Sequence, residues 1–194
     1  MASGPASVKV GHCPQCVRGR LYRMRRPLFD AMLSRTPLLS GMDLASRDRL
    51  VPCFEPHAFT EKQRILTTGS TGRLLGVLLE GHLDVQAREE DQVFTVDVLG
   101  PGDIFGEISF FDGQSPRTAD VVGQDEGLVA LLAWSEYEAL TRLEDPAAEV
   151  LEKAVLDLLA RRIQNMNRTL DDLMVATRDG SWLDALRRFL GMGG

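Results

Sequence analysis

Cysteine, histidine and long apolar runs are all scarce in this sequence of 194 residues. The three cysteines are an odd number, and disulfides are not expected in a reducing compartment. No apolar run approaches the roughly 18 residues needed to cross a bilayer. Residues 1–27 also lack the apolar segment of a secretory signal. The sequence therefore predicts a cytoplasmic protein without a membrane span.

Catalytic motifs are equally hard to find. None of the three histidines, His12, His57 and His82, lies in a serine or cysteine nucleophile motif. The glycine-rich segment GSTGR, residues 69–73, lacks the lysine and the spacing of a P-loop. The clustered histidine and aspartate ligands of metal-dependent hydrolysis are absent as well. We therefore do not expect an enzyme.

Charge is spread unevenly along the chain, whose net charge is −6. Residues 1–27 hold six basic residues and no acidic one, which leaves 16 basic against 28 acidic residues in the remainder. An acidic body argues against direct DNA binding or any general nucleic-acid-binding surface. The basic tail, residues 1–26, suits an acidic partner, a phosphate-rich surface or the acidic body itself, and equally a solvated terminus.

The same tail contains the segment HCPQC, in which His12, Cys13 and Cys16 are weak candidates for metal ligands. C-P-x-C is half of a zinc ribbon, and the second half is missing. Cys53, His57 or a partner chain would have to complete the site. Three interpretations stay open: a zinc site within the chain, metal or redox chemistry between chains, and incidental thiols.

Residues 27–54 have a helical pattern with two interruptions. Apolar residues recur at helical spacing from Leu28 to Leu33, and Pro37 and Gly41 interrupt the pattern. Asp43 is suited to cap the next helical turn, which we expect to carry Leu44 and Leu50 toward the core.

From His57 to about Trp134, short apolar runs alternate with glycine-containing turns every 8–12 residues or so. Phe94, Val96 and Val98 alternate with Thr95 and Asp97, as in a strand with one apolar face. This pattern predicts an antiparallel β-barrel or sandwich.

After Trp134 the pattern returns to helix. Ser135 is a candidate N-cap for a first helix, and Asp145 followed by Pro146 is a start signal for a second helix of about thirty residues. Asp179 and Gly180 end that helix, and residues 181–190 form a short amphipathic one. Apolar residues step by three and four along the long helix: Leu156, Leu159, Ile163, Met166, Leu170 and Leu173. Such a seam suits either self-association or packing on the barrel.

The stretch FGEISFFDGQSPRTA holds one acid, Glu107, and one base, Arg117, around a turn. A guanidinium matches phosphate geometry, and an ionised carboxylate accepts from a hydroxyl. Residues 108–111 can form one helical turn whose free N–H groups attract an anion. Spacing alone leaves two interpretations open: a site for a phosphorylated sugar, or a pair formed by the two side chains.

The segment GDIFGEISFFDGQSPRTADV resembles the phosphate-binding cassette of the cyclic nucleotide-binding domain family, which catabolite-activator-type regulators, cyclic-nucleotide-dependent kinases and gated channels share. The glycine, the acid, the arginine and the small residues after it match in order. The resemblance extends over about residues 27–173. It implies an α+β fold: an antiparallel β-barrel or jelly roll (double-stranded β-helix) with N-terminal helices and a long C-terminal helix.

The resemblance also implies roles for single residues. Glu107 would accept the ribose 2′-hydroxyl, and Arg117 would pair with the cyclic phosphate of cAMP or cGMP. Backbone groups near Gly106, Ile108 and Thr118 would help, and the Thr118 side chain could bond the phosphate or the base, which does not settle cAMP versus cGMP. The implied ligand-binding residues are Gly106, Glu107, Ile108, Ser109, Arg117, Thr118 and Ala119, with Asn167 beside Met166 on the long helix as a base contact or, alternatively, a core or surface residue. Thr68-Gly69-Ser70 replaces an acidic E-G-D motif, which predicts a looser loop.

These expectations divide the chain into a basic tail (1–26), a nucleotide-binding domain with the long helix (27–177) and a terminal helix (178–194). Few residues follow the long helix, so no helix-turn-helix is expected. The sequence predicts a regulatory sensor of a cyclic mononucleotide that acts through a homodimer or a protein effector. The alternatives are a scaffold subunit with a silent pocket, and a regulator without its DNA domain that pairs with a relative.

Overall fold

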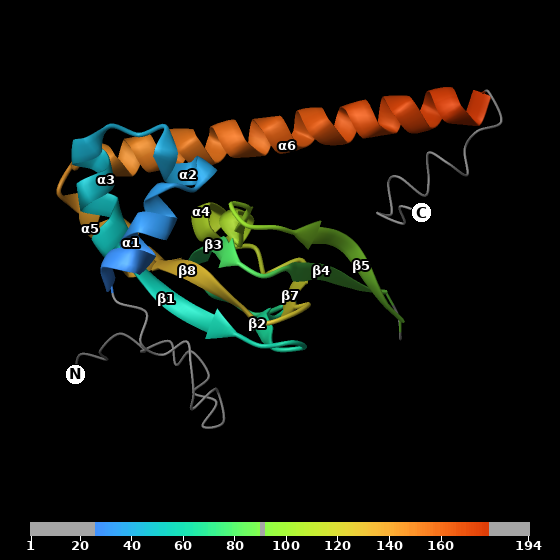
Figure 1. Ribbon diagram of the computed structural model, residues 1–194, viewed down its shortest axis with the longest axis horizontal. Coiled ribbons are helices and arrows are strands. Elements are labelled where there is room, and N and C mark those ends of the chain that lie inside the picture. Colours follow the sequence, from blue (N-terminus) through green and yellow to red (C-terminus); the bar gives the residue numbers. More distant parts are fainter. Residues whose placement is uncertain (1–25, 90–91, 179–194) are drawn as a thin grey trace. The chain divides into compact units, whose positions relative to one another are not determined.

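The computed structural model describes residues 26–89 and 92–178 (Figure 1). The chain divides into two compact units, residues 1–151 and 152–194, which are described separately below. The HCPQC segment and the expected terminal helix lie outside the described residues. In the part of the chain that is described, no helix is both long and apolar enough to span a bilayer.

Eight strands of the first unit form two antiparallel sheets of four (Figure 1). One sheet has the order β1-β8-β3-β6, with strands β1 (Phe54–Phe59), β8 (Gly127–Ala133), β3 (Leu74–Glu80) and β6 (Ile104–Phe105). The other has the order β2-β7-β4-β5, with strands β2 (Arg64–Leu66), β7 (Asp120–Gly123), β4 (Leu83–Glu89) and β5 (Gln92–Leu99). The expected α+β fold with a jelly-roll-like pair of sheets is confirmed.

All eight strands contribute side chains to one apolar cluster, so the core lies between the two sheets. Burial of each large apolar side chain contributes about 1.5–3 kcal/mol to stability. The cluster contains Phe59, Leu66, Leu78, Leu83, Leu99, Phe105, Val121, Val129 and Leu131.

One glycine lets an aromatic ring into this core. Gly76 of β3 pairs across the sheet with Phe105 of β6. A Cβ atom on Gly76 would overlap the ring of Phe105, so the ring occupies the space that any other residue would fill. Phe105 directly precedes the cassette, and Gly76 therefore helps to set the position from which the cassette starts.

Three short helices precede the sheets: α1 (Arg26–Ser34), α2 (Pro37–Ser40) and α3 (Leu44–Leu50), followed by the 3-10 helix η1 (Val51–Cys53). The expected interruptions are confirmed, since α1 ends at Ser34, before Pro37, and α2 ends at Ser40 with Gly41 as its C-cap. Asp43 caps α3 as expected, accepting from the backbone N–H of Ser46 at 2.9 Å. Leu50 is buried, but the expectation for Leu44 is wrong, because this residue at the start of α3 is 68% exposed.

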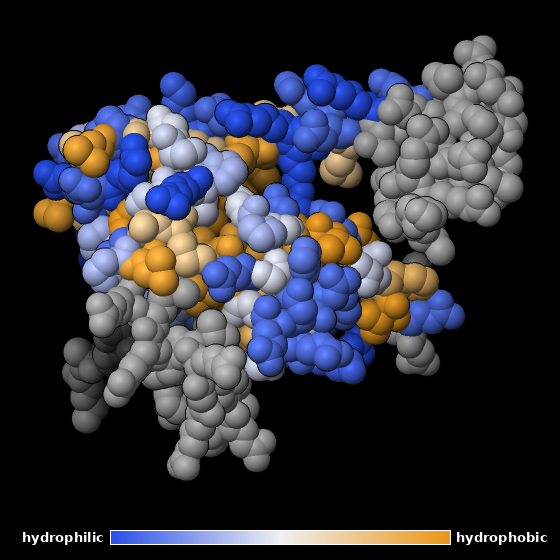
Figure 2. All heavy atoms as spheres, viewed as in Figure 1, coloured by the Kyte–Doolittle hydropathy of each residue, from blue (hydrophilic) through white to orange (hydrophobic). Residues whose placement is uncertain are grey.

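Strand β5 forms one edge of its sheet and pairs with β4 alone among the described strands. Seven consecutive residues, from Gln92 to Val98, are exposed, which means that both faces of the strand meet solvent. Phe94, Val96 and Val98 are all exposed, but a register shift at Val85 and Gln86 of β4 interrupts the alternation of faces along β5, so the expected single apolar face is not confirmed. Figure 2 shows hydrophobic atoms at the surface over this strand.

Helices α5 (Trp134–Arg142) and α6 (Pro146–Arg178) follow the last strand. The expected N-cap at Ser135 is wrong: α5 already begins at Trp134, whose N–H donates to the carbonyl of Arg73.

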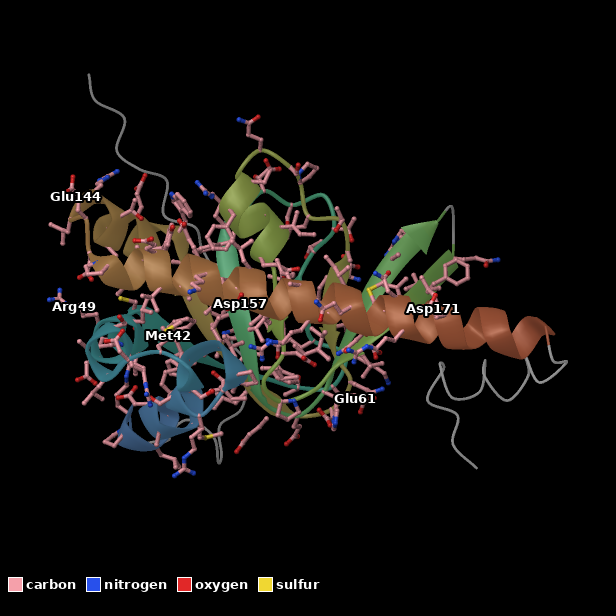
Figure 3. The ribbon with its side chains drawn as sticks, turned by 90° about the horizontal axis from the view of Figure 1, so that it is seen from above. Met42, Arg49, Glu61, Glu144, Asp157 and Asp171 are labelled. Carbon is pink, nitrogen blue, oxygen red and sulfur yellow. The ribbon has the colours of Figure 1, made fainter. Side chains whose placement is uncertain are left out.

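The start of α6 is confirmed, since Asp145 accepts from the backbone N–H of Ala147 at 3.0 Å. Its second oxygen pairs with Arg49 of α3 at 2.6 Å. Glu144 belongs to the turn between α5 and α6, and Figure 3 shows Arg49 at the same end of this unit as Glu144.

The second unit begins within α6, at Glu152. Asp157 and Asp171, labelled in Figure 3, lie along this part of the helix. Four residues of the apolar seam are more than half exposed: Leu156 at 65%, Ile163 at 59%, Met166 at 60% and Leu170 at 53%. More than half of the surface of each of these side chains is therefore left uncovered in the part of the chain that the structure describes.

Candidate functional site

The cassette is built from a strand, a short helix and a loop. Strand β6 ends at Phe105, and Gly106 turns the chain into helix α4 (Glu107–Asp112). Gly106 has φ +78°, and a Cβ there would lie 2.5 Å from the carbonyl oxygen of Leu74. Only glycine combines this backbone conformation with so close an approach. Gly113, with φ +67°, ends α4 in the left-handed conformation common at helix ends.

Arg117 is buried after this loop, with 7% of its surface exposed. Its Nη2 donates to the carbonyl of Gly72 at 2.9 Å, while its buried Nη1 has no hydrogen-bond partner. No carboxylate of the described residues forms an ion pair with it, and burial lowers the pKa of Arg117. A buried guanidinium is costly without a counter-charge, so the site is suited to an anion.

The structure does not pair the acid with the base of the cassette. Glu107 is half-buried at the first position of α4, and it forms no ion pair with Arg117 among the described residues. Of the two interpretations that spacing left open, internal pairing is therefore not the one the structure adopts.

The loop before β3 is tied to the cassette. Gly69 donates from its backbone to the carbonyl of Arg117 at 2.8 Å, and the N–H of Arg117 donates to the carbonyl of Ser70 at 3.2 Å. The N–H of Thr68 donates to a carboxylate oxygen of Asp120 at 2.6 Å. Backbone N–H groups and Asp120 thus hold this loop, and the looser loop expected from the missing acidic motif stays a prediction.

The remaining expected ligand residues occupy different environments. Ile108 is 57% exposed, whereas Ser109 is buried and its hydroxyl donates to the carbonyl of Gly106 at 3.2 Å. Thr118 is exposed and Ala119 is half-buried. Asn167 lies on α6, in the second unit, and is exposed.

Asp120 is a residue of this region that the sequence pattern did not single out. It is buried at the first position of β7 and pairs with Nε of Arg64 at 3.1 Å. Burial alone would raise the pKa of Asp120, but hydrogen bonds from Thr68 and the cations Arg64 and Arg88 lower the pKa below its ordinary value. The available signal was one acid at the start of an otherwise apolar strand.

We expect Asp120→Asn to make the stability of the protein less sensitive to acid. A carboxyl group whose pKa is lower in the folded than in the unfolded chain stabilises the fold above pH ~4, and this stabilisation is lost as pH falls through the folded pKa. The measurement is the free energy of unfolding in urea at pH 6 and pH 3.5. Wild type should lose more stability than the variant between these values, and equal losses would contradict the prediction.

Metal ligands do not cluster in residues 26–89 and 92–178, where no group of three or more His, Cys, Asp or Glu side chains could hold an ion. His12, Cys13 and Cys16 lie outside this part. Cys53 is half-buried, and burial raises the pKa of its thiol.

Comparison with known proteins gives a consistent result. Residues 56–142 match the family model of the cyclic nucleotide-binding domain. A CRP-like cAMP-activated global transcriptional regulator of Mycobacterium tuberculosis is 27% identical over 147 residues, which are 75% of this chain and 63% of that protein. The chain thus spans less than two thirds of the length of this relative.

Solved structures show the same fold. A cyclic nucleotide-binding domain from Methylobacillus flagellatus kt superposes with a TM-score of 0.64 at 22% identity, covering 76% of this chain and 83% of that one. The catabolite activator protein of Thermus thermophilus gives 0.58 at 26% identity, covering 72% and 63%. Together with the cassette geometry, these matches show that residues 56–142 belong to a domain of the cyclic nucleotide-binding family.

Proposed function

We propose that this protein is a non-catalytic regulatory sensor that binds a cyclic mononucleotide, cAMP or cGMP, at the cassette. The observation that carries the proposal is Arg117, a buried guanidinium with one unpartnered Nη1 and no carboxylate partner among the described residues. A cyclic phosphate supplies the missing negative charge and accepts charge-assisted hydrogen bonds. The cAMP-activated name of the mycobacterial relative supports this class of ligand.

The other cassette residues complete the proposed site. Glu107 accepts the ribose 2′-hydroxyl, and the backbone near Gly106 and Ile108 meets the phosphate. Thr118 is exposed and is free to bond either the phosphate or the base. Ser109 and Ala119 are the further proposed contacts in this unit, while Asn167, which belongs to the second unit, stays a prediction from the sequence.

Calorimetric titration tests the proposal. Wild-type protein should bind cAMP or cGMP with a dissociation constant in the micromolar range or below, and 5′-AMP, which carries the base and ribose with an open phosphate, should bind more weakly. Absence of binding to both cyclic nucleotides would refute the sensor and favour an assembly subunit with a silent pocket.

We further propose that the output passes through a protein interface, with a homodimer along α6 as the first candidate. The exposed seam supports this proposal, because four apolar side chains at heptad spacing are the usual content of a coiled-coil surface. The acidic body favours a protein partner over DNA. A scaffold subunit would show the same assembly with and without nucleotide, so light scattering under both conditions separates the two functions.

Ile163→Glu should convert the dimer to a monomer. In the proposed dimer the seam is buried, and a charge at position 163 would be strongly unfavourable there. The same charge at the neighbouring exposed position, Gln164→Glu, should leave the molar mass unchanged. The molar mass is measured by light scattering after size exclusion over a range of protein concentrations. A variant that keeps the wild-type mass would contradict the seam as the interface.

A further inference from the structure

Arg73 makes contacts with two helices from its place just before β3. Its Nε donates to the carbonyl of Phe110 at 2.7 Å, and its Nη2 to that of Phe111 at 3.2 Å. These carbonyls belong to the C-terminal part of α4. The guanidinium carbon of Arg73 lies 3.0 Å from the centre of the Trp134 ring, at the first residue of α5. One side chain therefore joins the cassette helix to α5.

Aromatic rings fill the space around this junction. Phe110 of α4 makes edge-to-face contacts with Trp134 and Tyr137 of α5, at centroid distances of 5.4 Å each. Phe111 contacts Tyr137 in the same way at 5.8 Å. Such contacts depend on ring orientation, so a rotation of α4 would have to move α5 or break the cluster.

The backbone extends the connection to the proposed phosphate site. The carbonyl of Gly72 accepts from Nη2 of Arg117, and the carbonyl of the next residue, Arg73, accepts from the N–H of Trp134 at 3.0 Å. The packing leaves little free space: a Cβ on Gly72 would lie 3.3 Å from Arg117, and one on Gly113 would lie 3.0 Å from Arg73. Through these two hydrogen bonds, the consecutive residues Gly72 and Arg73 connect Arg117 to the start of α5.

An arginine is specifically suited to this place. Its planar guanidinium donates to two neighbouring carbonyls while its face covers the indole ring, whereas the ammonium group of lysine has no plane to stack. Among the described residues no carboxylate forms a close ion pair with Arg73: carbonyl oxygens and an aromatic ring contact its guanidinium, and Glu138 and Asp112 act on its charge from farther away. An arginine that only fills surface space would not need both the two carbonyl acceptors and the stacked indole ring.

We propose that Arg73 is a positioning residue that fixes the cassette helix α4 on α5 and couples the occupancy of Arg117 to α5. The coupling part rests on the nucleotide binding proposed above; the positioning part does not. Phosphate bound at Arg117 redirects its guanidinium, the Gly72–Arg73 backbone follows, and the stacked Trp134 reports the change at the start of α5.

The test uses the full chain with Trp182→Phe, which leaves Trp134 as the only tryptophan. Arg73→Gln and Arg73→Lys are compared with Arg142→Gln, a control on α5 whose arginine makes an exposed pair with Glu138. Amide hydrogen exchange is measured without ligand, and Trp134 emission is followed alongside calorimetry as cAMP and cGMP are added.

In the unliganded chain, both Arg73 variants should exchange the amides of α4 at least about tenfold faster than wild type and the control. With ligand, they should bind about tenfold more weakly, within the range usual for coupled sites, and should lose the ligand-dependent change in Trp134 emission. A purely structural role would weaken stability but keep that emission change in the bound state.

The inference would be overturned if the Arg73 variants exchanged the α4 amides at the wild-type rate, or if they kept the change in Trp134 emission at saturating ligand. If wild type binds neither nucleotide, the proposed function fails, and exchange in the unliganded chain decides the positioning role alone.

Discussion

Arg117→Met should weaken cyclic nucleotide binding by about 100-fold or more while leaving the unliganded protein as stable as wild type or more stable. Charge-assisted hydrogen bonds to the phosphate contribute roughly 1.5–3 kcal/mol each, and 1.4 kcal/mol corresponds to a factor of ten. In the empty site the same guanidinium is buried with Nη1 unpartnered, so its replacement by an apolar side chain of similar length removes a cost. Calorimetry gives the affinity, and urea unfolding gives the stability.

Arg64→Met is the matched control for the stability effect. Arg64 pairs with the buried Asp120, and its loss leaves that carboxylate with one partner fewer. The stability of this variant should therefore fall where that of Arg117→Met does not. An Arg117 variant that binds as wild type would remove Arg117 from the site, and a large loss of its stability would show that the guanidinium is already satisfied in the empty protein.

Gly76→Ala should destabilise the protein by about 2–3 kcal/mol, the upper range for overpacking a core. The new methyl group overlaps the Phe105 ring, which has to leave its place between the sheets. Because Gly106 and Glu107 follow Phe105 directly, nucleotide affinity should fall together with stability. Urea unfolding and calorimetry measure the two effects.

Gly41→Ala is the control for this substitution, since a Cβ there meets no atom within 4 Å and the residue has φ −84°. Its stability should stay within about 0.5 kcal/mol of wild type, the usual limit for surface changes. Phe105→Leu, combined with Gly76→Ala, should recover part of the lost stability by shortening the overlapping side chain. A stable Gly76→Ala variant would mean that Phe105 has another place to pack.

The features that the sequence predicted well are local ones. Asp43 and Asp145 were predicted as caps because an N-cap depends on a few neighbouring residues and the start of a helical pattern. The cassette was predicted from its order of residues, and residues 94–98 lie in strand β5 as expected, although all of them are exposed. Local rules of this kind need no knowledge of the rest of the fold.

The features that the sequence did not reveal depend on contacts over long distances in the chain. Ser135 has the side chain of an N-cap, but α5 starts earlier because the Trp134 N–H meets a carbonyl 61 positions back, at Arg73. Leu44 is exposed because α3 buries the face that carries Ser46 and Leu50, and Leu44 lies on the other side of the helix. The sequence likewise did not reveal that the carbonyl of Gly72 accepts from Arg117. Gly72 lies in a glycine-rich loop, and residue types alone do not show which carbonyl of such a loop contacts a guanidinium.

Strand β5 has a consequence for how the protein behaves at high concentration. No other described strand pairs with its outer edge, so that edge offers backbone N–H and C=O groups to another extended chain, and the exposed Phe94, Val96 and Val98 add apolar surface to it. Asp97 is the only charged residue among the seven exposed positions of this strand. Aggregation by strand addition should therefore begin here, and a single lysine in place of Val96 should slow it without touching the core.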